Sequence, residues 1–330
     1  MEAIPATLGL RDQLAALSSK AFTADGEVRV PIHRTVAEYL AARAIAARVQ
    51  RGLPIGRVLA LMSGLDGGIV EPLRGLHAWL AVHCHSDRTA LIDRDPLGVV
   101  LYGDLTCFTT LDKEHVLRAL HREAQRFAWF RRGHWEAHPF GALATADMVP
   151  TFRDLLSAPN RDLAHQSLLD CVMDAIEHTL EPDALAALRG PLEKVVRDDS
   201  FGAWLRTSAL QAWLRLAPTD LRPARVLLDQ INSGAASDPD DELAGLLLDR
   251  LYPTQLTTNE VLGFFHRPKR ENLVGTYRHF WVDVLIDRTP PNEMATLADR
   301  WFEARSELQG QRWDLDRNRL SGRLLAAAVR

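Results

Sequence analysis

The 330-residue sequence lacks any run of about 20 apolar residues, the length that an α-helix needs to cross a bilayer. Its first residues, MEAIPATLGLRDQ, show no basic start followed by an apolar core, so we expect no signal peptide. Cysteine is scarce as well: Cys84, Cys107 and Cys171 are too few for a disulfide framework and fit a reducing compartment. These absences predict a cytoplasmic protein without a membrane partner.

The motifs of common catalytic sites are also missing. A phosphate-binding loop needs Gly-x-x-x-x-Gly-Lys-Ser/Thr, and the one glycine cluster, at residues 64–68, has no lysine and is interpreted as an interhelical turn. No Gly-x-Ser-x-Gly, His-Glu-x-x-His or Cys-x-x-Cys pattern occurs. We therefore assign no catalytic residue and no cofactor, and we expect no nucleotide hydrolysis by this chain alone.

Groups of potential metal ligands have simpler interpretations. His83, Cys84 and His85 have no second pair of donors at zinc-like spacing, so they are interpreted as the end of a helix. Clustered carboxylates could hold a metal or act as acid and base, but beside proline they are typical of turns and helix caps. We interpret two such groups as caps: Asp93, Asp95 and Asp104, and then Asp238, Asp240 and Glu242. The sequence therefore gives no metal site.

What the chain does contain favours helices. Alanine, leucine and arginine dominate, and all three are strong helix formers. Residues 35–49 place Val36, Tyr39 and Leu40 near helical spacing, which predicts a helix packed on the core through these side chains. One exception lies near the start, where short alternating segments flank Asp25 and Gly26 and predict a β-hairpin over about residues 21–31.

A repeat is visible in the second half of the chain. When residues 164–173 (AHQSLLDCVM) are aligned with residues 205–214 (LRTSALQAWL), Ser167 falls on Ser208 and Leu169 on Leu210, a spacing of 41. Leu248 follows 38 residues later. Spacings near 40 with two helices each are typical of HEAT-like repeats, in which stacked helix pairs share a continuous core. We therefore predict an all-α, HEAT-like helical repeat solenoid, with antiparallel helix pairs at about residues 161–216.

The best candidate for a ligand surface is a basic segment with interleaved aromatic residues. Arg118, Arg122 and Arg126 follow one another at four-residue spacing and share one helix face. The positive charge continues past the predicted helix end at Arg131 and Arg132, next to Trp129. Such a surface suits phosphate, stacked bases or an acidic protein, and the alternative is a solvated helix face. A net charge of -4 and a pI near 6.3 argue against general nucleic-acid binding. Residues 266–270 (HRPKR) form a weaker basic patch.

Residues 31–47 (PIHRTVAEYLAARAIAA), which follow the predicted hairpin, resemble a junction in bacterial NACHT-type STAND NTPases, the NLR-like proteins. In that family a winged-helix-like unit ends in a hairpin, and a His-Arg-Ser/Thr-x-x-Glu-Tyr-Leu-Ala-Ala helix opens the helical C-terminal region. The matching positions here run from His33, Arg34 and Thr35 to Glu38, Tyr39, Leu40, Ala41 and Ala42. Arg74-Gly75-Leu76, Ala78-Trp79-Leu80, Asp95-Pro96 and Tyr102-Gly103-Asp104 also resemble the tail of such proteins.

The NTPase module of that family is absent from this sequence, so the resemblance implies its sensor or scaffold portion. It implies a winged-helix-like remnant at residues 1–34 and a HEAT-like repeat domain at residues 35–330. It also implies a non-catalytic function: binding a protein or other ligand within a signalling or defence system, with an NTPase module or an effector as possible partners. Two alternatives stay open: a HEAT-like DNA-processing enzyme of the alkylpurine glycosylase type, and a plain protein-interaction adaptor.

Overall fold

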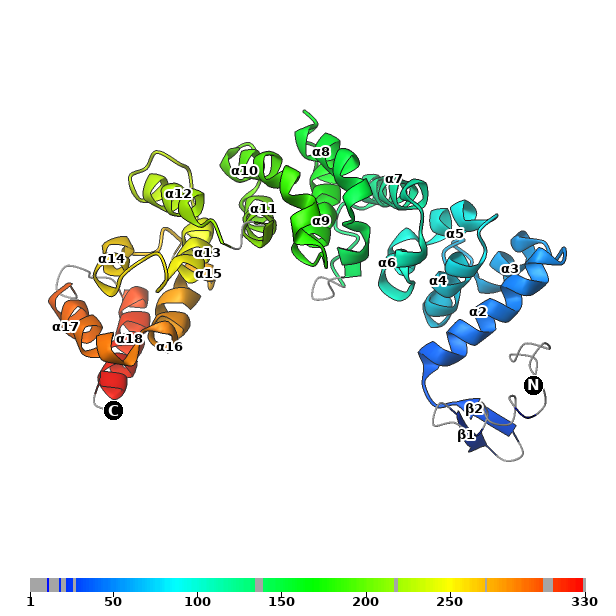
Figure 1. Cartoon of the computed structure of the whole chain (residues 1–330), viewed down its shortest axis with the longest axis horizontal. Helices are drawn as coiled ribbons and strands as arrows, with labels where there is room; N and C mark the ends of the chain where they lie inside the picture. Colours follow the sequence, from blue (N-terminus) through cyan, green and yellow to red (C-terminus); the bar gives the residue numbers. More distant parts are fainter. Residues whose placement is uncertain are drawn as a thin grey trace. The chain divides into compact units, whose positions relative to one another are not determined.

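The computed structural model describes residues 11, 18, 22–25, 28–133, 139–216, 219–270, 272–304 and 311–328 (Figure 1). Helices dominate these residues, which confirms the all-α class. No helix within these ranges is both long and apolar enough to cross a membrane. The chain divides into two compact units. Unit 1 comprises Met1–Thr151 with Asp162–Leu180, and unit 2 comprises Phe152–Arg161 with Glu181–Arg330.

The described elements of unit 1 are two short strands followed by helices. Its strands are β1 (Phe22–Asp25) and β2 (Val28–Pro31), and its α-helices are α2 (Arg34–Gln50), α3 (Ile55–Met62), α4 (Arg74–His83), α5 (Arg88–Arg94), α6 (Pro96–Tyr102), α7 (Thr110–Arg126) and α9 (Leu163–Glu177). Short 3-10 helices lie between them: η1 (Glu71–Leu73), η2 (Leu105–Cys107), η3 (Pro139–Leu143) and η4 (Ala146–Met148).

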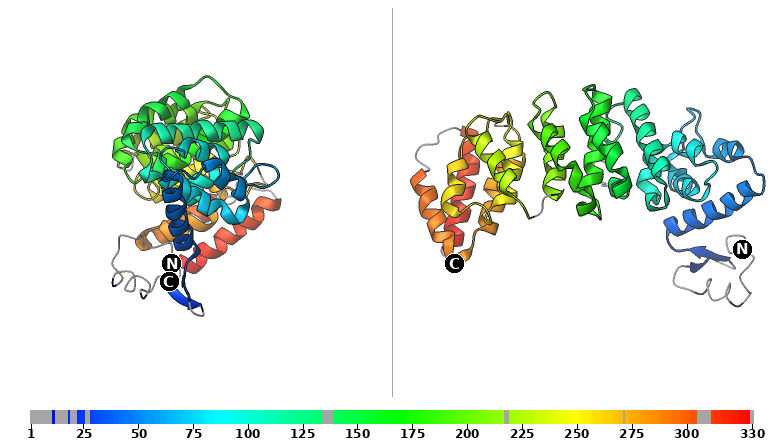
Figure 2. Two further views of the ribbon diagram at one scale, coloured as in Figure 1. Left: turned by 90° about the vertical axis from the view of Figure 1, so that its right-hand side faces the viewer. Right: turned by 45° about the horizontal axis from the view of Figure 1, so that its top comes forward.

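The predicted hairpin is present, and it leads directly into α2. β1 and β2 pair antiparallel, with Phe22 opposite Pro31 and Asp25 opposite Val28. The two strands lie next to the start of α2 in both views of unit 1 (Figures 1 and 2). The predicted turn at Gly26 lies outside the described residues. Most of residues 1–21 lie outside them as well, so the winged-helix-like remnant at residues 1–34 stays a prediction.

The helix predicted for residues 35–49 is confirmed as α2, but the residues at its centre differ from the expected ones. Ala42 and Ala46 are its fully buried residues, whereas Val36, Tyr39 and Leu40 are half-buried. Small side chains let α2 lie close against α4, with which it makes its main contact. The Tyr39 ring therefore lies at the edge of this contact, where it meets Trp79 at 5.1 Å and His83 at 4.9 Å between ring centroids.

Unit 2 is built entirely from helices among its described residues. It contains part of α8 (Val149–Ser157), then α10 (Arg189–Arg197), α11 (Ala203–Leu216), α12 (Arg222–Asn232), α13 (Glu242–Leu251), α14 (Thr258–Val261), α15 (Thr276–His279), α16 (Leu285–Arg288), α17 (Met294–Ala304) and α18 (Gln311–Ala328). A π-helical turn, η7 (Phe280–Val284), joins α15 to α16, and the 3-10 helices are η5 (Pro182–Leu188), η6 (Leu262–Phe264) and η8 (Pro291–Glu293).

Side-chain hydrogen bonds between successive helix pairs recur at one sequence separation. Many of the long-range bonds within each unit join residues that are 34 to 39 positions apart. In unit 1 these pairs include Arg34 with Pro72, Thr110 with Asp147, Glu114 with Thr151 and Arg131 with Asp170. In unit 2 they include Arg161 with Asp198, Arg225 with Glu260, Glu242 with Thr276 and Tyr252 with Thr289. Residues about 34 to 39 positions apart thus lie in contact repeatedly along both units.

The aligned leucines of the sequence repeat have matching surroundings. Leu169 on α9 and Leu210 on α11 are both 0% exposed. The serines two positions before them also behave alike, because the Ser167 hydroxyl donates to the Leu163 carbonyl at 2.9 Å and the Ser208 hydroxyl to the Trp204 carbonyl at 3.2 Å. The expectation that the two leucines occupy like environments is confirmed.

This match predicts similar costs for truncating either leucine. Leu169→Ala and Leu210→Ala should each lower the free energy of unfolding by about 3 kcal/mol, because each removes a fully buried side chain. Leu61→Ala, at a position that is 84% exposed, should change it by less than about 0.5 kcal/mol. Urea unfolding of the three variants measures these values. A large difference between the two core variants would show that the positions are not equivalent.

Candidate functional site

The segments that carry the family resemblance lie apart in the sequence and meet in unit 1. The Arg34 guanidinium donates to the Glu38 carboxylate at 2.7 Å and to the Pro72 carbonyl at 2.6 Å, so the start of α2 is tied to η1. The Glu38 carboxylate in turn lies against Gly75 in the first turn of α4, where a Cβ would overlap it. The ion pair of Arg34 with Glu38 thus packs against a glycine that leaves room for it.

A second ion pair continues this cluster from α4 to α6. Arg74 donates two hydrogen bonds to Asp95, at 2.7 and 3.1 Å, and its guanidinium lies 5.6 Å from the centre of the Tyr102 ring. Asp95 also accepts from the Gly98 amide at 2.8 Å and so caps α6, as predicted. All these contacts hold helices together, so the motif has a structural function here.

The cluster forms the wall of an open groove of about 350 Å³. The groove is lined by Arg34, Thr35, Glu38, Glu71, Pro72, Gly75 and Tyr102. Charges of both signs are present, and the arginine and glutamate of α2 are bonded to each other. Because charges of both signs line the groove, the groove does not favour a ligand of one particular charge.

His77 lies behind this cluster and is fully buried. Neither of its ring nitrogens makes a hydrogen bond of good geometry with another described residue. Burial is the main cause that lowers the pKa of His77 to about 4, and the charges of Arg74 and Arg94 lower it further, while Asp95 acts in the opposite direction. This side chain is therefore neutral in the folded protein over the physiological pH range.

The predicted arginine stripe lies on α7, and each of its guanidinium groups has an acidic neighbour. Arg118 pairs with Glu114 at 3.6 Å and Arg126 with Glu123 at 3.7 Å. Arg122 reaches across to Asp93 on α5. All three arginine side chains are nevertheless exposed, Arg126 most of all at 78%. The stripe is therefore accessible but largely neutralised by its own carboxylates.

The residues beyond the stripe divide into a buried and an exposed group. The Arg131 side chain is only 13% exposed, pairs with Asp170 at 2.9 Å and Asp174 at 3.5 Å, and lies 4.6 Å from the Phe140 ring centre. It joins the end of α7 to α9 and has little surface left for a ligand. Trp129 is 50% exposed, and Arg132 is also exposed. The structure thus brings Arg126, Trp129 and Arg132 to the surface, whereas Arg131 is half-buried and bonded to α9.

Most of the other predicted sites have the simpler structure expected of them, and Asp93 is an exception. Residues 64–68 form a turn in which the Gly64 amide donates to the Gly68 carbonyl. Cys84 is buried just after the end of α4, and Asp104 caps η2 through the Thr106 amide. Asp93 does not act as a cap, since it pairs with Arg122 and His115. Within the described ranges, no three His, Cys, Asp or Glu side chains gather as metal ligands would.

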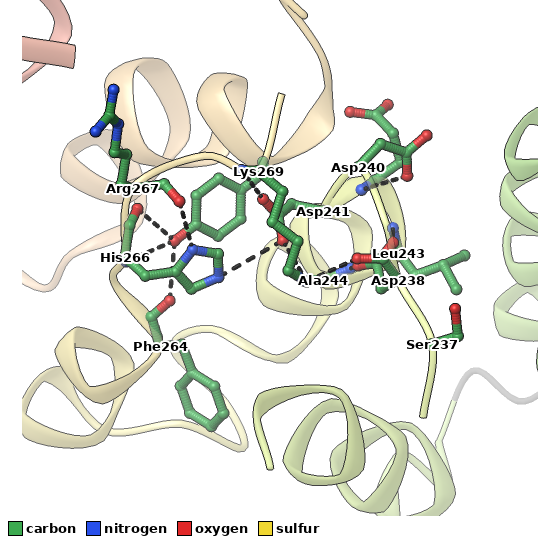
Figure 3. A network of polar contacts seen from close by, with 12 residues as sticks. Ser237, Asp238, Asp240, Asp241, Leu243, Ala244, Phe264, His266, Arg267 and Lys269 are labelled. Carbon is green, nitrogen blue, oxygen red and sulfur yellow. Dashed lines mark hydrogen bonds and ion pairs between the residues drawn. The ribbon is translucent and has the colours of Figure 1, made fainter. Parts of the chain in front are cut away.

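A polar network that the sequence indicated only in part lies in unit 2 (Figure 3). Asp238 accepts from the amides of Leu243 and Ala244, at 3.3 and 2.8 Å, and so caps α13, as expected for this acidic segment. Asp241 instead accepts from the Lys269 amide at 2.8 Å and pairs with the Lys269 ammonium, also at 2.8 Å. The weak basic patch at residues 266–270 is thus fastened to the start of α13.

Two further contacts fix the loop that carries Lys269. The His266 ring stacks on Tyr277, with ring centroids 4.8 Å apart, and its Nε2 lies 3.6 Å from the Asp241 carboxylate. The Tyr277 hydroxyl accepts from the His266 amide at 2.8 Å and donates to the Phe264 carbonyl at 3.0 Å. Asp241 is fully buried, and its φ of 64° is in the left-handed region, which few non-glycine residues adopt. The buried, left-handed aspartate is the residue that sequence reasoning missed.

Burial also changes the proton affinity of the network. It raises the pKa of Asp238 to about 6, although the amides of Ala244 and Leu243 and the charge of Lys269 oppose the change. A cavity of about 140 Å³ lies beside the network, lined by Leu228, Ile231, Asn232, Ala244, Phe264, His266 and Lys269. An apolar pocket with a few polar side chains in its lining is a candidate for a small-molecule binding site.

The alternative of a DNA-processing enzyme would need a buried carboxylate that is free to act on a substrate. Four aspartates are buried among the described residues, and each has an intramolecular partner: Asp174, Asp238, Asp240 and Asp241. This geometry gives that alternative no support.

Comparisons with models of protein families, with curated proteins and with solved structures yielded no match to the chain.

The contact of Glu38 with Gly75 can be tested by a double-mutant cycle. Gly75→Ala should lower the free energy of unfolding by about 1–2 kcal/mol, because the new Cβ displaces Glu38 from Arg34. In a Glu38→Ala background the same change should raise stability by up to about 1 kcal/mol, because alanine favours helix more than glycine does. Chemical unfolding of the four proteins measures the coupling. Equal effects in both backgrounds would contradict the contact.

The buried His77 predicts a loss of stability on acidification. Its pKa is about 4 in the folded protein against 6.5 as the ordinary value, so the unfolded chain binds more protons between these pH values and stability falls as the pH decreases. Between about pH 7 and pH 4 the wild type should lose about 3 kcal/mol more than His77→Leu, as measured by urea unfolding. His33→Gln, at an exposed position, should behave as the wild type does. Identical pH profiles for the wild type and His77→Leu would contradict this assignment.

Proposed function

We propose that this chain is a non-catalytic, HEAT-like helical-repeat scaffold that binds a protein partner, as the sensor or scaffold region of a NACHT- or NLR-like signalling or defence protein. The observation that carries the proposal is the recurrence of interhelical hydrogen bonds at separations of 34 to 39 residues. Repeats of this length stack neighbour on neighbour and give extended surfaces that are used for binding.

A further recurring contact supports the repeat architecture. In unit 1 the Glu38 carboxylate lies against Gly75 at the start of α4. In unit 2 the Glu242 carboxylate lies against Gly275 and accepts from the Thr276 amide at 3.0 Å, at the start of α15. Each glutamate belongs to one helix pair, and its carboxylate contacts the first turn of the next pair. Such a contact is expected between neighbouring repeats.

The meeting of the resemblance motifs at one place supports the family part of the proposal. Arg34, Glu38, Gly75, Arg74 and Asp95 come from three separate segments and form one connected cluster. Because this cluster joins the hairpin-bearing end of α2 to the following helices, it would fit a junction between a winged-helix-like unit and a repeat region.

The surface that suits a protein partner best lies at the end of α7 and in the residues that follow it. We define this α7 surface as Arg126, Phe127, Trp129 and Arg132. Phe127 and Trp129 are each at least half exposed, and Arg126 is the most exposed residue of the stripe. Tryptophan and arginine are the residues enriched in binding hot spots, and the two arginines favour an acidic partner. Arg118 and Arg122 extend this surface along α7 as a polar rim.

The proposal is tested with Arg126→Ala/Trp129→Ala and the control Arg57→Ala/Leu61→Ala, which removes an exposed arginine and an exposed apolar side chain from α3. A partner enriched by the immobilised wild-type chain is purified and titrated by calorimetry. Loss of a hot spot should weaken its binding about 30-fold, which corresponds to about 2 kcal/mol, while the control leaves binding unchanged. Equal binding to both double variants would remove the α7 surface from the proposal. The absence of any saturable partner would overturn the scaffold function itself.

A further inference from the structure

The cavity beside the Asp238–Lys269 network has the size of a single-ring compound. Its volume of about 140 Å³ is close to that of an apolar cavity of about 150 Å³ known to admit benzene. It is bounded by α12, by the first turn of α13 and by the loop that follows η6. All these elements belong to unit 2, so the cavity is separate from the α7 surface of unit 1.

The inner lining of the cavity is apolar. Leu228 and Ile231 project from α12, Ala244 from α13 and Phe264 from the end of η6. All four residues are buried, so their positions are fixed by packing rather than by solvent. An apolar ring would replace water against these side chains, which is the main source of affinity for a small ligand.

The polar residues of the cavity are Asn232, His266 and Lys269. The Lys269 ammonium has three N–H groups. One of them donates to the Asp238 carbonyl at 2.7 Å, and the ammonium also forms an ion pair with the Asp241 carboxylate at 2.8 Å. The side chain remains 43% exposed, so a further N–H can reach an acceptor in the cavity. The Asn232 side-chain amide offers a second donor at the same site.

The charges around the cavity favour an uncharged acceptor over an anion. Asp241 already balances the charge of Lys269 at 2.8 Å, and the Asp238 carboxylate, which caps α13, interacts electrostatically with both of these groups. A ligand carboxylate would therefore meet two nearby negative charges, whereas a carbonyl oxygen would only accept hydrogen bonds.

The left-handed backbone at Asp241 helps to hold this arrangement in place. It directs a fully buried carboxylate toward the loop, where Asp241 binds both the amide and the ammonium of Lys269 (Figure 3). Lys269 is thus positioned before any ligand arrives, and less conformational entropy is lost on binding.

We propose that this cavity binds a small uncharged compound made of one ring and a carbonyl group, such as an aromatic amide. The ring lies against Leu228, Ile231 and Phe264, and the carbonyl oxygen accepts from Lys269 and Asn232. The site is independent of the protein partner proposed for the α7 surface.

Benzamide is the probe, titrated into the full chain and followed by NMR of the backbone amides around the cavity. With nine heavy atoms it should bind with a dissociation constant on the order of 1 mM. Benzoate should bind at least about tenfold more weakly because of Asp238 and Asp241, and toluene about threefold to tenfold more weakly because it lacks the acceptor.

Matched variants locate the site. Asn232→Ala should weaken benzamide binding about threefold to tenfold, because one hydrogen bond is lost, whereas Asn259→Ala, also at an exposed position, should leave it unchanged. In Lys269→Met, the preference for benzamide over toluene should shrink, because only the hydrogen bond from Asn232 remains, and retained toluene binding shows that the cavity is intact.

Three results would overturn the proposal: no benzamide-induced shifts at the cavity at about ten times the expected dissociation constant, benzoate or toluene binding as tightly as benzamide, or equal effects of Asn232→Ala and Asn259→Ala. The last comparison decides the matter even if Lys269→Met fails to fold.

Discussion

The bonds from charged or hydroxyl side chains of one helix to residues of a later helix are the contacts on which the rest of this structure depends. Several helices are short, such as the seven residues of α5 and of α6, and helices of that length are not stable alone in water. Each must therefore be held by its neighbours. The apolar faces provide most of the free energy, while bonds such as Arg131 with Asp170 and Arg225 with Glu260 fix the order and register of the pairs.

Several of these bonds combine an arginine, a carboxylate and an aromatic ring. Arg88 pairs with Asp112 and lies 4.5 Å from the Phe108 ring centre, and Arg161 pairs with Asp198 and lies 4.2 Å from that of Phe201. The planar guanidinium can bond a carboxylate along its edge and stack on a ring with its face. The high arginine content of the chain is therefore explained in large part by intramolecular structure. The same reasoning applies to much of the predicted basic surface, since Arg131 belongs to this group and the stripe on α7 is paired along its length.

The sequence was sufficient for features that depend on local chemistry. Helical composition, the hairpin around Asp25 and the caps at Asp95 and Asp238 were predicted from neighbouring residues, and the like burial of Leu169 and Leu210 was predicted from the sequence repeat. Burial of individual side chains was harder to predict. Tyr39 looked like a core residue from its spacing, but Ala42 and Ala46 occupy the centre of that interface because α2 and α4 lie so close together. Asp241 could not be distinguished from its acidic neighbours, because its position depends on Lys269, which lies 28 residues further along the chain.

The regular separation of the interhelical bonds also has a consequence for how the protein forms on the ribosome. Since many partners lie only 34 to 39 residues apart, a helix pair can acquire these contacts as soon as the next pair has left the exit tunnel. Low sequence separation of contacts also lowers the entropy that must be lost before a contact forms. Apolar faces would then be exposed to solvent or to chaperones for the time needed to synthesise about 40 residues, rather than for that of the entire chain.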